Sequence, residues 1–210
     1  MKLFLKIIGI FFAAIVIGVI AVALLMPSMD RLGASSEEIS ASLPGDELVP
    51  SPNISYTRAI SVNASPEQIY PWIVQIGADR GGWYSYDWFE TNVLRCKNTN
   101  ADRIHEEWQG LEVGGQVKMC PDEKMPPAYQ VARMDPGQAI VLGHQEGDRW
   151  VEVWQFVMVP QEDGSTRLVI RSRSEMGGWF WNIMRPGEFI MMRGMMQGIK
   201  ERAEALAQGG

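Results

Sequence analysis

The chain has 210 residues, of which 46% are hydrophobic and 21% charged, a composition typical of folded rather than disordered proteins. Its formal net charge of −6 argues against nucleic acid as a partner, because phosphate binding needs a basic surface. Eight tryptophans and thirteen methionines supply large, adaptable apolar surfaces for a protein of this size.

Residues 7–26 form an unbroken run of apolar residues and glycine, and Lys2 and Lys6 precede it. As a helix, the run would be about 30 Å long, which matches the hydrocarbon core of a bilayer. Because positive charge precedes the run and is not in excess after it, we expect residues 1–26 to be a single-pass membrane anchor with a cytoplasmic N-terminus. The rest of the chain would then lie on the exported side, in the periplasm or outside the cell. A cleaved signal peptide is the alternative, because Ala21-Val22-Ala23 fits the cleavage pattern.

Residues 27–42 contain few large apolar side chains, which is typical of a flexible linker. We therefore expect one globular domain at residues 43–210, held close to the membrane.

The domain opens with a strand at residues 56–62, which alternate and are rich in β-forming side chains. Ser65, Pro66 and Gln68 then supply an N-cap, an N1 proline and a capping-box partner for a short helix to about residue 76. A second short helix is expected to begin at Ser85.

Five further strands with short connections predict an antiparallel meander. In the last of them, apolar residues alternate with Arg167, Arg171 and Arg173, which predicts a sheet with one solvated face. The five strands are expected at residues 115–120, 128–134, 138–144, 150–159 and 166–174.

A long helix is expected at residues 187–207, with Pro186 at its start and Gly209 just past its end. Its apolar stripe includes Met192 and Met196 and must be buried against the sheet. The predicted fold class is therefore α+β, with one curved antiparallel sheet wrapped around a long C-terminal helix and two short helices after the first strand.

This order of elements resembles the helix-grip fold of the START-like (SRPBCC) superfamily, which includes polyketide cyclase/dehydrase-like proteins. The motifs LPGDELVP, PWIVQIGADRGGWYSYDW, ADRIHEEWQGLEVGG and PGEFIMMRGMMQGIKERAE resemble a membrane-anchored bacterial subgroup. The resemblance covers residues 43–207. It implies a deep apolar cavity between sheet and terminal helix that holds lipids, sterols, polyketides or other hydrophobic small molecules.

The sequence favours neither a metal site nor a nucleotide site. It has two histidines, His105 and His144, and no HxxxH or CxxC spacing, so we expect no metal. It has no GxSxG, GxGxxG or GxxxxGK motif, so we expect no cofactor.

Asp87 and His105 are the candidates for general acid–base catalysis, if the loop at residues 101–108 meets the cavity mouth opposite Asp87. The alternative is an exposed His105 in a loop fixed by an ion pair between Asp102 and Arg103.

Three groups of residues are candidates for ligand binding. The aromatic residues of the 80–90 segment either line a pocket or fill the end of the sheet as core. A carboxylate, Glu152, shares a strand face with apolar residues and is the candidate polar anchor inside a cavity. Methionines of the terminal helix suit an adaptable pocket wall, or ordinary core. The candidates are Trp83, Tyr84, Tyr86, Trp88, Glu152, Trp154, Phe156, Met192 and Met196.

Trp179, Phe180 and Trp181 follow two glycines and are expected in a loop. There they would form a lid or an edge that touches the membrane. The alternative is that they fold back onto the sheet.

Cys96 and Cys120 are the only cysteines. In an oxidising compartment they could form a disulfide worth roughly 3 kcal/mol. The alternative is two buried thiols.

The leading hypothesis is an exported, membrane-anchored domain that binds a hydrophobic small molecule or lipid. One alternative is a cyclase/dehydrase-type enzyme acting on a similar ligand. Another is a non-catalytic module that binds a partner and whose cavity is filled by side chains. Fold resemblance alone does not decide among them.

Overall fold

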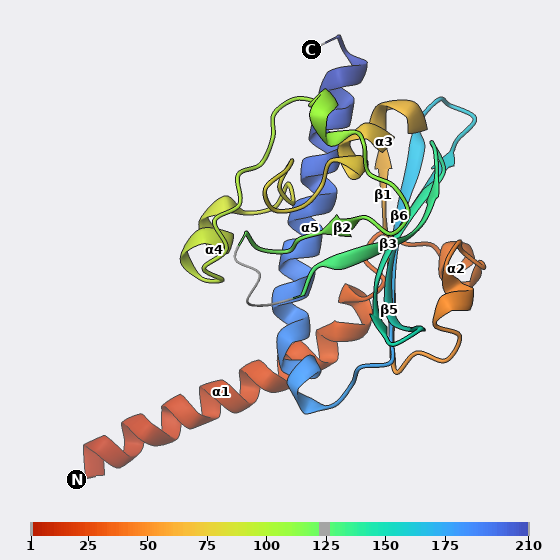
Figure 1. Ribbon diagram of the computed structural model, residues 1–210. Coiled ribbons are helices and arrows are strands. Elements are labelled where there is room, and N and C mark those ends of the chain that lie inside the picture. Colours follow the sequence, from red (N-terminus) through yellow and green to blue (C-terminus); the bar gives the residue numbers. More distant parts are fainter. Residues whose placement is uncertain (1, 122–126, 210) are drawn as a thin grey trace.

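The computed structural model describes residues 2–121 and 127–209. Six antiparallel strands form one sheet in the order β1-β6-β5-β4-β3-β2, and the long helix α5 lies along one face (Figure 1). The predicted α+β fold, with a meander and a long terminal helix, is confirmed. The elements are α1 (Lys2–Met29), α2 (Ser36–Ser40), η1 (Asp46–Leu48), β1 (Ile54–Val62), α3 (Pro66–Val74), α4 (Asp87–Asn92), η2 (Glu106–Trp108), β2 (Gln116–Val117), β3 (Tyr129–Asp135), β4 (Ala139–Glu146), β5 (Arg149–Pro160), β6 (Thr166–Ser174) and α5 (Trp179–Ala207).

Helix α3 begins where its capping signals predict. The backbone N–H of Ser65 donates to the Gln68 side chain at 2.9 Å, and Pro66 occupies the first helical position. Ile69 and Ile73 are fully buried in the core between the sheet and α5. The predicted short helix is therefore confirmed, and it ends at Val74.

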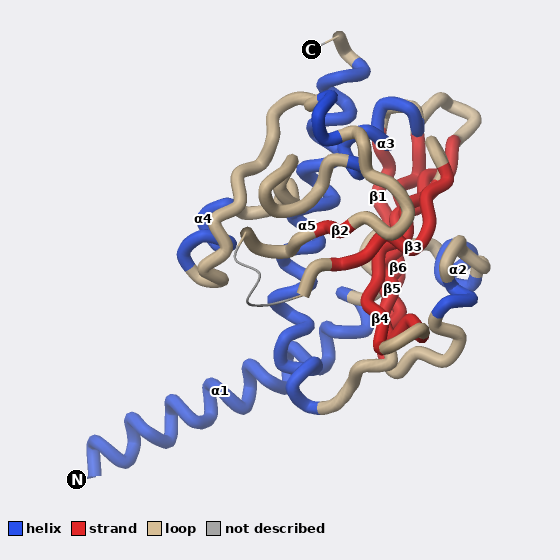
Figure 2. The backbone as a smooth tube through the Cα atoms, viewed as in Figure 1, coloured by secondary structure: helices blue, strands red, loops and turns tan. Residues whose placement is uncertain are grey.

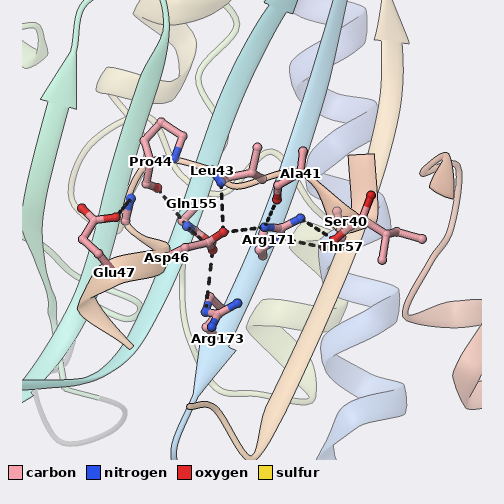
Figure 3. Close-up of polar contacts among 12 residues, drawn as sticks. Ser40, Ala41, Leu43, Pro44, Asp46, Glu47, Thr57, Gln155, Arg171 and Arg173 are labelled. Atoms are coloured by element: carbon pink, nitrogen blue, oxygen red, sulfur yellow. Dashed lines mark hydrogen bonds and ion pairs between the residues drawn. The ribbon is translucent and has the colours of Figure 1, made fainter. Parts of the chain in front are cut away.

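The second face of the sheet is covered rather than solvated, so the prediction of an exposed arginine face is wrong. Arg171 is only 3% exposed and donates to the Asp46 carboxylate at 2.7 Å (Figure 3). It also donates to the carbonyl oxygens of Glu38 and Ile39 in α2, at 2.8 and 2.9 Å. The last carbonyls of a helix have no intrahelical partner, and a cation there satisfies them.

Residues 30–50 therefore pack on the sheet instead of forming a free tether. The N–H groups of Thr57 and Ala59 donate to the carbonyls of Asp30 and Leu32, each at 3.0 Å, so this segment pairs with the edge of β1. Figure 2 shows α2 and α5 on opposite sides of the sheet. A segment poor in large apolar residues docks because three arginines of β6 bind its polar groups, which sequence pattern alone does not reveal.

Helix α5 begins eight residues before the predicted start, so Trp179 and Trp181 lie in its first turn and not in a loop. Gly178 precedes the helix with a φ of 96°, a conformation that glycine adopts without strain. Pro186 lies inside the helix, where it removes one backbone donor without ending the helix.

The apolar run at residues 7–26 lies within helix α1, which points away from the sheet (Figure 1). Over the described residues, no helix is both long enough and apolar enough to cross a membrane.

Two glycines of α5 allow the aromatic segment at residues 83–86 to pack against the helix. A Cβ on Gly198 would lie 2.0 Å from the carbonyl oxygen of Tyr84, and one on Gly194 would lie 2.8 Å from the Tyr86 ring. Tyr84 itself has a φ of 55° and donates its hydroxyl to the Trp72 carbonyl at 3.0 Å. The glycine spacing thus fixes this segment to the second half of α5.

We expect Gly198→Ala to reduce the free energy of unfolding by about 3 kcal/mol, because the new methyl group meets backbone rather than a side chain that can move. Gly187→Ala is the matched control in the same helix, since a Cβ there meets nothing within 4 Å. Helix propensity should make this control more stable by about 0.5–1 kcal/mol. Urea unfolding of both variants measures the difference, and equal stability would contradict the close approach.

Candidate functional site

A row of polar side chains crosses the sheet on the face that carries α5. His144 of β4 lies opposite Glu152 of β5 in the strand register, and their side chains meet at 2.8 Å. Both are half-buried, at 18% and 15% exposure. Trp154 and Phe156 continue along β5 on the same face, so a charged pair lies directly beside an aromatic surface.

The His144 ring faces a hydrogen-bond acceptor on each side. Its Nδ1 meets the Glu152 carboxylate and its Nε2 meets the Pro127 carbonyl oxygen at 3.2 Å. Only the doubly protonated ring donates to both. Burial lowers the pKa of His144, but the hydrogen bond and charge of Glu152 outweigh burial and leave the pKa above its ordinary value.

Tyr129 of β3 stacks on the His144 ring, with 4.1 Å between ring centroids. Its ring also lies 5.7 Å from that of Trp154. Burial raises the pKa of the Tyr129 hydroxyl well above its ordinary value, and the charges of Glu152 and Glu188 raise it further. Because Glu152 belongs to the sheet and Glu188 to α5, this hydroxyl lies between the two layers and stays protonated.

Trp154 has a buried indole N–H without a hydrogen-bond partner among the described residues. Its ring stacks on Trp83 at 5.5 Å and contacts Phe156 at 4.9 Å. Trp83, by contrast, donates its own indole N–H to the Met119 carbonyl at 3.2 Å. Buried polar groups are nearly always paired, so this donor is available to an acceptor from outside the chain. The indole N–H of Trp72, in the same core, is the other buried indole donor without a partner among the described residues.

A fully buried arginine closes the far side of this row. Arg58 of β1 donates to both carboxylate oxygens of Glu188 at 2.8 and 3.0 Å. It also donates to the Met29 carbonyl oxygen at 2.9 Å and lies over the Tyr56 ring at 4.1 Å. The pair thus joins β1, the end of α1 and the first half of α5.

Two open clefts flank the helix. One of about 590 Å³ lies between the start of β1 and the start of α5, and one of about 300 Å³ lies between the 84–86 segment and the second half of α5. Tyr84 and Tyr86 border the second cleft. The first is lined by Asn53, Ile54, Ser55, Gly177, Gly178, Asn182 and Arg185.

The other pocket candidates lie in two different environments. Trp88 is 71% exposed on α4, away from the sheet. The core between the sheet and α5 contains Trp83, Phe156, Met192 and Met196 as buried residues and Trp154 as a partly buried one.

Asp87 and His105, the two candidate acid–base residues, each contact other residues and not one another. Asp87 begins α4 and accepts a hydrogen bond from Asn100 at 2.6 Å. His105 stacks on Trp108 and contacts Glu107 at 3.1 Å. Over the described residues, no three His, Cys, Asp or Glu side chains cluster in a way that could hold a metal ion.

Cys96 and Cys120 are joined as a disulfide that links the end of the α4 loop to the segment after β2. Beside it, Glu90 is buried and accepts a hydrogen bond from Asn98 at 2.9 Å. Burial raises the pKa of Glu90.

Sequence reasoning did not predict the roles of four residues in this row, which are Arg58, Tyr129, His144 and Glu188. The turn at residues 146–149 could have indicated the cross-strand partner of His144. In a regular hairpin, residues equally far from the turn on the two strands lie opposite each other. Regular counting would place His144 opposite Val151, however, and a β-bulge after His144 moves it opposite Glu152.

No protein-family model matches the chain, and no curated protein matches it. Solved structures with a similar arrangement include the Aha1 dimer from Colwellia psychrerythraea, at 13% identity, with 70% of this chain and 96% of that chain covered and a TM-score of 0.43. The self-sacrificing resistance protein CalC from Micromonospora echinospora matches at 11% identity, with 72% and 94% covered and a TM-score of 0.44. A norcoclaurine synthase point mutant from Thalictrum flavum, in complex with a transition-state analogue, matches at 15% identity, with 75% and 96% covered and a TM-score of 0.43.

We expect the His144–Glu152 pair to stabilise the fold more at low pH than at high pH. The folded-state pKa of His144 is raised, so its contribution is complete below its unfolded pKa of about 6.5 and is lost as pH rises through the folded value. His144→Gln should therefore cost about 1–2 kcal/mol at about pH 6 and much less at about pH 9. Urea unfolding across this range measures the gap.

His105→Gln is the control for that experiment, because it removes the other histidine of the chain. It should keep the wild-type pH slope. A gap between wild type and His144→Gln that is equal at both ends of the range would contradict the ion pair.

Proposed function

We propose that the chain binds a hydrophobic small molecule or lipid between the sheet and α5, with the polar group of the ligand near Trp154 and the His144–Glu152 pair. The observation that carries the proposal is the buried, unpartnered indole N–H of Trp154 on an otherwise apolar face. An unsatisfied buried donor costs roughly 1–3 kcal/mol, and a ligand acceptor would remove that cost.

The apolar surroundings suit a ligand of this kind. Phe156 and the Trp83–Trp154 stack provide flat aromatic surface, and Met192 and Met196 provide adaptable surface on the helix. Tyr129, Trp154, Glu152 and His144 all keep some accessible surface, and the two clefts described above are lined by other residues. Such a combination of apolar walls and few polar groups is typical of small-molecule sites.

The cyclase/dehydrase alternative needs a proton-transfer group beside the ligand. His144 is placed for that role more favourably than Asp87 or His105, because it lies on the face that carries Trp154. The partner-binding alternative is favoured to the extent that buried side chains fill the space between the sheet and α5, because a filled core leaves no room for a ligand.

We expect the full chain, purified gently, to retain a bound apolar molecule. Native mass spectrometry followed by lipid extraction should identify it. Glu152→Ala should lower the bound fraction several-fold, because it removes the partner that holds His144 beside the aromatic surface. Glu146→Ala, on an exposed carboxylate of the same hairpin, is the matched control and should leave the fraction unchanged. A chain that stays empty when lipids are supplied would contradict the proposal.

Membrane attachment through α1 and export of the domain are part of the proposal. The support is the apolar run itself, the two lysines before it, and the exposure of its apolar side chains, such as Phe11, Phe12 and Leu24. The first turn of α5 would then lie near the bilayer, because α1 and α5 contact each other. Trp179 is 76% exposed there.

We expect brominated lipids to quench the tryptophan fluorescence of the full chain in liposomes through Trp179 and Trp181. The double variant Trp179→Phe and Trp181→Phe should lose most of this quenching. Residues 1–26 contain no tryptophan, so an inserted anchor adds no signal of its own. Trp88→Phe on exposed α4 is the control, and unchanged quenching in the double variant would exclude a membrane edge at this turn.

A further inference from the structure

Two hydrogen-bond donors of the site have no partner among the described residues, and the aromatic rings that carry them are neighbours. The first is the indole N–H of Trp154, which is buried and has no acceptor among the described residues. The second is the hydroxyl of Tyr129, whose described contacts are ring contacts with His144 and Trp154. The two rings are 5.7 Å apart.

Both donors are held in place by stacking rather than by hydrogen bonds. Trp154 stacks on Trp83 with an interplanar angle of 16°, and Tyr129 stacks on His144 with an angle of 18°. Trp83 is fixed in turn by its bond to Met119, and His144 by Glu152 and Pro127. Donors held in this way lose little conformational freedom when a ligand binds.

The charges around the two donors determine whether the ligand group that binds them can itself carry a charge. The charges of two carboxylates, Glu152 and Glu188, act on the Tyr129 hydroxyl and raise its pKa. Glu152 already pairs with His144, and Glu188 already pairs with Arg58, so each cation is used. A negatively charged ligand group would enter between two carboxylates with no free cation among these residues, which costs free energy in a half-buried place.

A positively charged group fits no better. It could approach either carboxylate and donate to the tyrosine oxygen, but it has no lone pair for the indole N–H, which would stay unpaired. A neutral oxygen acceptor satisfies both donors and meets no charge conflict.

We propose that Trp154 and Tyr129 together bind a neutral carbonyl oxygen, as in a ketone or ester, on an otherwise apolar ligand. This inference rests on the proposed function and adds the chemistry of the ligand's polar group. It separates esters and ketones from free fatty acids, which share the same hydrocarbon chains but carry a carboxylate at neutral pH.

The test uses the full chain and three probes of similar length, which are methyl laurate, lauric acid and n-tridecane. Equilibrium dialysis at neutral pH gives the affinity of each. Methyl laurate should bind most tightly. Trp154→Phe and Tyr129→Phe should each weaken methyl laurate about 3- to 10-fold, the effect of one hydrogen bond, and should change n-tridecane less than about twofold.

Trp88→Phe is the matched control, because it makes the same kind of substitution on an exposed residue outside the site and should change no affinity. Lauric acid binding as tightly as methyl laurate would overturn the neutral-acceptor inference and leave the proposed function standing. The same conclusion follows if the two variants weaken methyl laurate and n-tridecane equally. Failure of all three probes to bind would overturn both.

Discussion

The arrangement of the helices around the sheet depends on the ion pair between Arg58 and Glu188. Arg58 is fully buried, so its charge is tolerable only because Glu188 binds it with both oxygens and the Met29 carbonyl accepts a third bond. Breaking such a pair from one side leaves a buried charge and costs about 3–5 kcal/mol. The first half of α5 must therefore lie over β1, and the end of α1 must meet both at the same point. Asp30, which contacts Arg58 and Arg185, reinforces this junction.

The two halves of α5 are held by different interactions. The second half is packed through Met195, Met196 and Ile199 and through the close contact of Gly198 with Tyr84. The first half is held by the ion pair and leaves Ile183 exposed. Close apolar packing therefore fixes the second half, whereas a charged contact fixes the first.

Sequence pattern predicted most of the fold because alternation and capping are local signals. The strands at 56–62, 150–159 and 166–174 and the Ser65 capping box appear where these signals place them. The site was less predictable, because it depends on pairings between distant residues. Glu152 was recognised as a carboxylate on an apolar face, but its partner was hidden by the bulge after His144. The start of α5 was misplaced because Pro186 carries the signal of a first helical position, and the structure places it inside the helix instead.

The arginines of β1 and β6 make the two faces of the sheet chemically different. Arg58 points toward α5, whereas Arg167, Arg171 and Arg173 point to the other face and bind residues 33–50 through carbonyl and carboxylate groups. Gln155 of β5 adds two bonds to the same segment, to Pro44 and Asp46. Polar atoms of the segment are thus paired with polar atoms of the sheet, and a ligand there would have to break several bonds to enter. On the α5 face, the Trp154 indole N–H and the Tyr129 hydroxyl have no partner among the described residues, so the proposed ligand would gain bonds there without breaking any. On the covered face, one buried atom, the Gln155 side-chain oxygen, is without a described partner, but the segment at residues 33–50 already occupies that face.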